Sequence, residues 1–209
     1  FAAAVRALGI GDGQQVVIYD DSDVRSAARA WWTFRLMGLR RVAVLDGGLP
    51  KWRAEGRPLD AAIPPVRDRH LTAIRQPALV RDVTQVAQAA KLGTASIVDA
   101  RAAARFRGEA PEPRPGLRAG HIPGSRNLPF GQLFADDGTM LPPDRLRAAF
   151  VDAGVDLAGP VITTCGSGVT AAVLSLALER IGHRDHALYD GSWTEWGSFS
   201  DLTIATGDA

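Results

Sequence analysis

The chain carries the stretch PVITTCGSGVTAAVLSLALER at residues 160–180, which has the pattern of a buried strand, a short loop and a helix. The loop, residues 165–170, begins with Cys165. Its two glycines allow the backbone to turn tightly, and the first N–H groups of the next helix have no partners within that helix. Such a loop favours anions, because N–H donors and the positive end of the helix dipole face one space. We expect Cys165 to be held there as a thiolate, which is a nucleophile.

The alternative is that Cys165 is an ordinary core residue, since a lone cysteine is often just a small buried hydrophobic side chain. A core cysteine needs neither two glycines nor a serine nor a helix start directly after it. A cysteine that must hold a negatively charged adduct needs all of them. We therefore interpret Cys165 as a catalytic residue.

The other residues of the loop receive roles from their positions after the cysteine. Ser167 is expected to be catalytic, because its hydroxyl can donate to the bound substrate or to the departing group. Thr170 is also expected to cap the helix that follows. The backbone N–H groups of four residues are expected to bind the substrate: Gly166, Gly168, Val169 and Thr170.

The sequence CGSGVT after an apolar strand resembles the active-site loop of the rhodanese superfamily, and most closely that of its 3-mercaptopyruvate sulfurtransferases. This resemblance implies that the cysteine takes up a sulfur atom as a persulfide and passes it to a thiol, thioredoxin or cyanide. Related phosphatase loops carry an arginine six positions after the cysteine, and that position is Ala171 here. The alanine argues against a phosphatase.

The resemblance also implies that two arginines bind the substrate, and they fall on Arg105 and Arg114. The sulfur donor would be a small anion, and the planar guanidinium matches a carboxylate well. Relatives that prefer thiosulfate tend to have basic residues directly after the cysteine, whereas Gly166 and Ser167 are neutral. This difference favours 3-mercaptopyruvate as the donor. Two alternatives stay open: a thiosulfate sulfurtransferase, and a persulfide carrier or interaction module that is not an enzyme.

An internal repeat with a constant offset of 144 residues organises the rest of the chain. It superposes the strand, helix and strand of residues 16–45 on those of residues 160–189, with Trp52 on Trp196. The counterpart of Cys165 is Asp21, so the first copy lacks the nucleophile. We predict an α/β protein with two rhodanese-like domains, each a parallel sheet flanked by helices.

The repeat also predicts the domain boundaries. Residues 1–58 would be the C-terminal part of a non-catalytic domain, incomplete at its N-terminus because the first copy has no counterpart of the elements expected between residues 83 and 143. Residues 59–77, which contain Pro64, Pro65 and Pro77, would be a linker. Residues 78–209 would form the catalytic domain, with helices at 83–91, 144–153 and 171–181 and strands at 96–101, 161–162 and 186–189.

Several polar and aromatic residues near the site are expected to be structural. Asp99 and Arg101, at the end of a predicted strand, would form an ion pair. His121 lies in a turn motif, HIPG, that is structural in the second domain of the family. Trp193 and Trp196 would fill the protein near the loop.

Composition limits the remaining functions. The balance of 24 basic and 23 acidic residues argues against nucleic acid or a membrane as a partner. One cysteine and four scattered histidines predict neither a metal site nor another cofactor. A single cysteine also excludes an internal disulfide, and it suits a reducing compartment such as the cytoplasm.

Overall fold

The computed structural model describes residues 1–62 and 65–208. We call residues 1–58 the N-terminal unit and residues 78–208 the C-terminal unit. The N-terminal unit has a sheet of two parallel strands, and the C-terminal unit has a sheet of five parallel strands. The predicted α/β class with a parallel sheet in each part is therefore confirmed.

The large sheet places the end of its central strand at the expected site. The strand order is β3 (Val80–Arg81), β7 (His186–Tyr189), β6 (Val161–Thr164), β4 (Ser96–Asp99) and β5 (Arg126–Asn127). All four residues of β6 are buried, as expected for a parallel strand that is covered on both faces. Because ligands of such sheets bind at the carboxyl ends of the strands, Cys165 directly after β6 lies at the functional edge.

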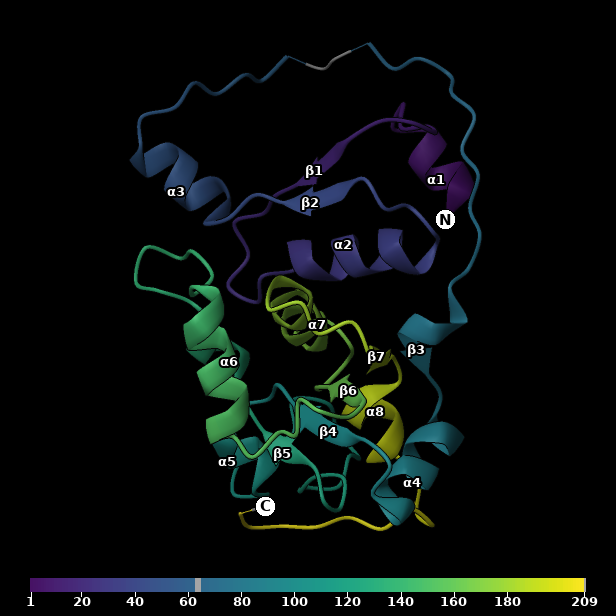
Figure 1. The fold of residues 1–209 in the computed structure, drawn as a ribbon, viewed down its shortest axis with the longest axis vertical. Helices are drawn as coiled ribbons and strands as arrows, with labels where there is room; N and C mark the ends of the chain where they lie inside the picture. Colours follow the sequence, from purple (N-terminus) through teal and green to yellow (C-terminus); the bar gives the residue numbers. More distant parts are fainter. Residues whose placement is uncertain (63–64, 209) are drawn as a thin grey trace.

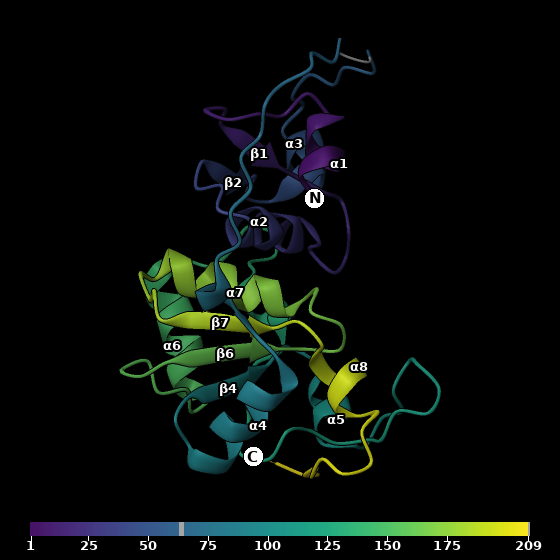
Figure 2. The same ribbon diagram turned by 90° about the vertical axis from the view of Figure 1, so that its right-hand side faces the viewer.

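Helices cover both faces of this sheet, and alternate residues of each strand point to opposite sides. Val161 and Leu188 belong to a core shared with α7 (Ala171–Arg180) and α6 (Pro143–Asp152). Ile162 and Tyr189 belong to a second core beneath α4 (Val83–Leu92). Figure 2 shows α7 above the sheet and α4 below it. The shorter elements are η1 (Pro77–Leu79), α5 (Ala103–Phe106), η2 (Phe130–Leu133) and α8 (Ser192–Trp196).

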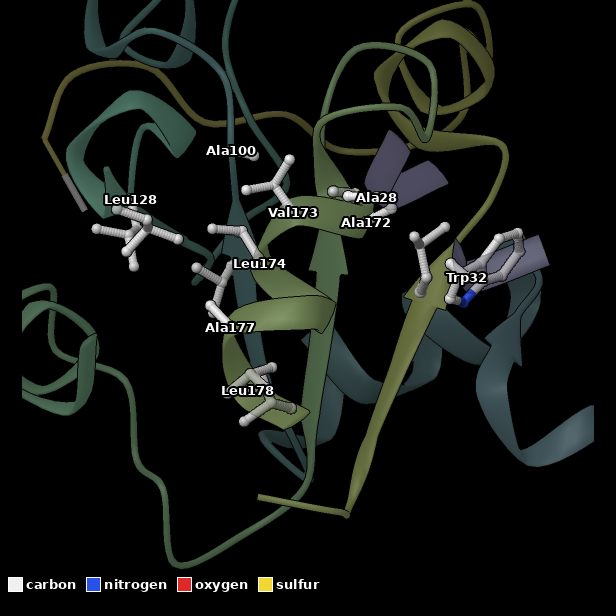
Figure 3. Close-up of a cluster of buried hydrophobic side chains, with 14 of the residues drawn as sticks. Ala28, Trp32, Ala100, Leu128, Ala172, Val173, Leu174, Ala177 and Leu178 are labelled. Carbon is white, nitrogen blue, oxygen red and sulfur yellow. The ribbon is translucent and has the colours of Figure 1, made fainter. Parts of the chain in front are cut away.

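The N-terminal unit stacks on the outer side of α7. Its elements are α1 (Ala2–Arg6), β1 (Val16–Ile18), α2 (Ala27–Leu36), β2 (Val42–Val44) and α3 (Gly48–Ala54). Helix α2 lies between its own small sheet and α7 (Figure 1). Ala28 and Trp32 of α2 enter the core that α7 shares with the large sheet, and Ala28 lies beside Ala172 (Figure 3). The two units therefore have one common hydrophobic core.

The structure confirms the repeat. Shifted by 144 residues, the bounds of α2 become those of α7, and β2 falls on β7. Predicted elements differ from observed ones mainly at their ends. Strand β4 stops at Asp99 rather than residue 101, because the Asp99 carboxylate accepts a hydrogen bond from the Arg101 N–H and turns the chain. Residues 103–106, for which no helix is predicted, form α5.

Residues 65–77 run along the N-terminal unit before they enter β3 (Figure 1). Thr72 donates to the Asp12 carboxylate, Ile74 donates to the Met37 carbonyl, and Gln76 donates to the Leu36 carbonyl. Residues 63–64 of the predicted linker, and Pro64 with them, lie outside the described residues. None of the described helices is both long enough and apolar enough to cross a membrane.

We predict that His186 of β7 makes stability pH-dependent. Burial, with Arg184 and Arg35 nearby, lowers the pKa of His186 to about 4, and neither ring nitrogen has a hydrogen-bond partner among the described residues. The unfolded chain then binds a proton near pH 6.5 while the folded protein does not. The free energy of unfolding should therefore fall by about 3 kcal/mol as the pH drops from 7 to 4.

Urea unfolding at several pH values measures this dependence. His186→Leu should reduce the slope between pH 6.5 and pH 4.5. The part that remains would come from buried His121, whose pKa burial also lowers, and from carboxylates such as Asp12 and Glu55, whose pKa values are lowered by hydrogen bonds. His183→Leu, at a ring outside the core, is the matched control. An unchanged slope in the His186 variant would contradict the assignment.

Candidate active site

Cys165 lies at the carboxyl end of β6, and its side chain is buried. Its backbone N–H donates to the Ser192 Oγ at 3.3 Å, and the same oxygen lies 4.0 Å from the Cys165 Sγ. Ser192 begins α8 with a φ of 51°, an uncommon value for a residue with a side chain. Ser192 was not predicted from the sequence. Its position directly after Asp190 and Gly191, which the 144-residue offset pairs with Asp46 and Gly47, was the one available signal.

The first turn of α8 holds two carbonyls of the loop. Trp193 N–H donates to the Cys165 carbonyl and Thr194 N–H to the Gly166 carbonyl, both at 2.9 Å. In a trans peptide the N–H points opposite to the carbonyl, so the N–H groups of Gly166 and Ser167 are turned away from α8. Within the described part of the chain, no backbone N–H from residue 166 to residue 170 has a hydrogen-bond acceptor. These N–H groups are available to an anion, as the sequence predicts.

Gly168 turns the loop backbone as predicted, whereas Thr170 does not cap the helix that follows. Gly168 has a φ of 77°, where glycine is favoured, and a Cβ there would lie 2.7 Å from Nη1 of Arg29. Thr170 occupies the cap position of α7, but its side chain makes no capping hydrogen bond. The predicted cap is wrong because the Thr170 backbone is already helical, which turns the hydroxyl away from the first turn.

Arg105 and its partners form a buried charge network beside the loop. Arg101 makes hydrogen bonds to both carboxylate oxygens of Asp99, which confirms the predicted ion pair. The Glu112 carboxylate links Arg101, at 2.8 Å, to Arg105, at 2.5 Å. The Arg105 Nη2 lies 3.1 Å from the position of a Cβ on Gly166. The network thus holds a guanidinium directly over the loop, and Glu112 is a member that the sequence analysis missed.

Arg114 reaches the same loop through one threonine. Its Nη1 donates to the Thr194 Oγ1 at 2.6 Å, and this hydroxyl donates to the Gly166 carbonyl at 2.6 Å. The structure therefore brings both predicted arginines to Gly166. Ser167 is exposed at the mouth of the loop, and its hydroxyl has no hydrogen-bond partner among the described residues.

The residues expected to be structural, among them His121 and Trp193, are buried, and their side chains have well-defined partners. The His121 ring stacks on Phe106 at 3.8 Å, and its Nδ1 bonds the Phe106 carbonyl at 2.9 Å. Trp193 packs under the Arg101 guanidinium at 4.4 Å. Among the described residues there is no cluster of three or more side chains that could hold a metal ion.

Comparison with known proteins agrees with this geometry. The family model described as "Rhodanese-like domain" matches residues 2–55 and 82–199. This chain belongs to the rhodanese family. The 3-mercaptopyruvate sulfurtransferase of Escherichia coli K12 is 43% identical over 98% of this chain and 72% of that protein. The thiosulfate/3-mercaptopyruvate sulfurtransferase 1 of Arabidopsis thaliana, named as mitochondrial, is 42% identical over 98% of this chain and 59% of that protein.

Solved structures of the family have the same fold. The crystal structure of Tum1 from Saccharomyces cerevisiae has a TM-score of 0.89 at 32% identity, with 100% of this chain and 75% of that chain covered. The crystal structure of SseA from Escherichia coli has a TM-score of 0.82 at 40% identity, over 92% of this chain and 72% of that chain. The chain thus spans between about three fifths and three quarters of the length of these relatives.

We predict that the Glu112 carboxylate is essential for the stability of this site. Glu112→Ala would leave Arg101, whose side chain is 1% exposed, without one of its two carboxylate partners. The loss should lower the free energy of unfolding by about 3 kcal/mol. Glu109→Ala is the control in the same loop, because Glu109 is exposed and water screens its pair with Arg107, so its loss should change the stability far less. Equal effects of the two substitutions, measured by urea unfolding, would contradict this prediction.

Proposed function

We propose that the protein is a sulfurtransferase that moves a sulfur atom from 3-mercaptopyruvate to a thiol or cyanide through a persulfide on Cys165. The observation that carries this proposal is the loop itself. Its N–H groups have no acceptor among the described residues, a guanidinium lies over it, and its cysteine is the only one in the sequence. A thiolate and then a persulfide anion would be stabilised there.

In the first half-reaction the Cys165 thiolate attacks the sulfur of 3-mercaptopyruvate. The new S–S bond forms as the C–S bond breaks, and the electron pair leaves on carbon as the enolate of pyruvate. The proton of the substrate thiol ends on the methyl group of pyruvate, so the products are pyruvate and the Cys165 persulfide anion. Arg105 and Arg114 would hold the substrate carboxylate, and the exposed Ser167 hydroxyl would donate to the carbonyl that becomes the enolate.

In the second half-reaction an acceptor attacks the outer sulfur. A thiolate, from a small thiol or from thioredoxin, takes the sulfur and leaves the Cys165 thiolate, and cyanide gives thiocyanate in the same way. Persulfide chemistry needs a free thiol, so a reducing compartment such as the cytoplasm suits it.

The two units would have different roles in this proposal. Residues 78–209 would be the catalytic rhodanese-like domain, since they carry the cysteine and both arginines. Residues 1–58 would be part of a non-catalytic domain, with residues 59–77 as the linker. Asp21, the counterpart of Cys165, cannot act as a sulfur nucleophile.

Thiosulfate is the second candidate donor, and the name of the Arabidopsis relative includes it. The N–H groups of the loop would donate to the oxygens of thiosulfate as well as to those of a carboxylate. The third possibility, a persulfide carrier without turnover, is separated from both enzymes by steady-state kinetics with either donor.

The proposal predicts that the donor adds about 32 Da, one sulfur atom, to the protein. Cys165→Ser should lose both this adduct and turnover, because the serine hydroxyl is not ionised at neutral pH. Intact mass spectrometry after incubation with 3-mercaptopyruvate, together with pyruvate release, measures the two effects. Sulfur transfer by the serine variant would refute the mechanism.

Arg105 provides a test of donor preference. Arg105→Ala should lower kcat/KM for 3-mercaptopyruvate by about ten- to a hundredfold, since a charged hydrogen-bonded contact contributes roughly 1.5 to 3 kcal/mol. Arg105→Lys should recover only part of this loss. Arg107→Ala, which removes a neighbouring arginine paired with Glu109, should leave kcat/KM unchanged. Equal losses with 3-mercaptopyruvate and thiosulfate would reduce Arg105 to a general electrostatic role.

A further inference from the structure

Arg29 of the N-terminal unit reaches across to the loop of Cys165. Its Nη1 donates to the Gly168 carbonyl at 3.2 Å and to the Asp190 Oδ1 at 2.5 Å. Gly168 belongs to the loop, and Asp190 follows β7 in the C-terminal unit. One side chain of α2 thus connects the non-catalytic part of the chain to the backbone of the site.

The position of the Arg29 guanidinium is fixed from several sides. It lies over the Trp32 ring at 4.6 Å, and Trp32 is buried with its Nε1 donating to the Leu79 carbonyl. The Asp190 carboxylate forms an ion pair with the Nη1 of the same guanidinium. A guanidinium held by a ring and a carboxylate loses little further freedom when it also binds a carbonyl.

The consequence of this contact follows from the geometry of the peptide bond. Arg29 holds the carbonyl of Gly168, so the Val169 N–H of the same trans peptide points the opposite way. Helix α8 fixes the carbonyls of Cys165 and Gly166 in the same manner. Arg29 therefore fixes the 168–169 peptide of the loop from the N-terminal unit. It does so at Gly168, whose positive φ is one that glycine adopts without strain.

We propose that Arg29 is a positioning residue that holds the 168–169 peptide so that the Val169 N–H stabilises an anion at Cys165. The role of Arg29 in sulfur transfer rests on the proposed function, in which the anion is the Cys165 persulfide or the anionic sulfur donor. The orientation itself does not depend on which anion binds. It can therefore be tested on the cysteine without any sulfur donor.

The test compares alkylation of Cys165 by iodoacetate and by iodoacetamide. Both reagents consume the thiolate, but only iodoacetate carries an anion that the loop can stabilise. In Arg29→Met the rate with iodoacetate should fall about tenfold relative to the rate with iodoacetamide, as expected for one charge-assisted hydrogen bond. Arg29→Lys should recover only part of the ratio, because a point charge cannot reproduce the fixed fork. Complete recovery with lysine would overturn the proposal, since charge alone would then suffice.

Arg35→Met is the matched control. Arg35 lies on the same helix and also crosses to the C-terminal unit, where it pairs with Glu179 at 3.3 Å, away from the loop. Both methionine variants should lower the melting temperature, but Arg35→Met should leave the ratio of the two alkylation rates within twofold of the unmodified protein. A similar change in both variants would overturn the proposal, because Arg29 would then act only through packing of the two units.

Turnover separates this proposal from the proposed function. If the protein transfers sulfur, Arg29→Met should lower kcat/KM by about the same tenfold, and an unchanged value would refute the positioning role. If no donor is turned over while the alkylation ratio changes as described, the orientation of the loop by Arg29 stands and the sulfurtransferase assignment fails.

Discussion

The packing of α7 between two layers is the constraint on which the rest of the structure depends. Its inner side covers β6 and β7, and its outer side receives Ala28 and Trp32 of α2. A helix that is buried on two sides must be apolar around most of its circumference, and seven of its ten residues are buried. The same helix begins directly after the loop of Cys165. The position of Cys165 is therefore set by a core to which both units contribute.

A network of paired charges holds Arg105 beside the loop of Cys165. Its guanidinium is held in place while part of it stays accessible. The Asp99 and Glu112 carboxylates neutralise the deeply buried Arg101, and Glu112 extends to Arg105, which is still 26% exposed. Arg101 thus anchors the network in the interior of the protein, and Arg105 remains accessible at the surface. Buried charges of this kind are tolerated because each is paired and hydrogen-bonded.

Much of this architecture could be predicted from the sequence, because its signals are local. The offset of 144 residues related α2 to α7, and CGSGVT indicated the strand, loop and helix around Cys165. Arg105 and Arg114 were assigned from the resemblance to a known family rather than from a local pattern, and both lie at the loop. Ser192 and Arg29 act through contacts with segments farther away in the sequence. Glu112 contacts Arg101 and Arg105 nearby, but only because the intervening chain folds back, which no local pattern indicates. The predicted Thr170 cap failed on a backbone angle that residue identity alone does not determine.

The two Asp-Gly pairs of the repeat reveal how far the halves have diverged. Asp46 and Asp190 are equivalent, and each accepts a hydrogen bond from an arginine on the helix of the opposite half, Arg180 for Asp46 and Arg29 for Asp190. The arginines themselves are not equivalent, because the offset places Arg29 on Val173. A second copy of the C-terminal unit in place of the N-terminal unit would therefore present a valine where Arg29 donates to the Gly168 carbonyl. The two halves share one fold, but they cannot replace each other at this contact.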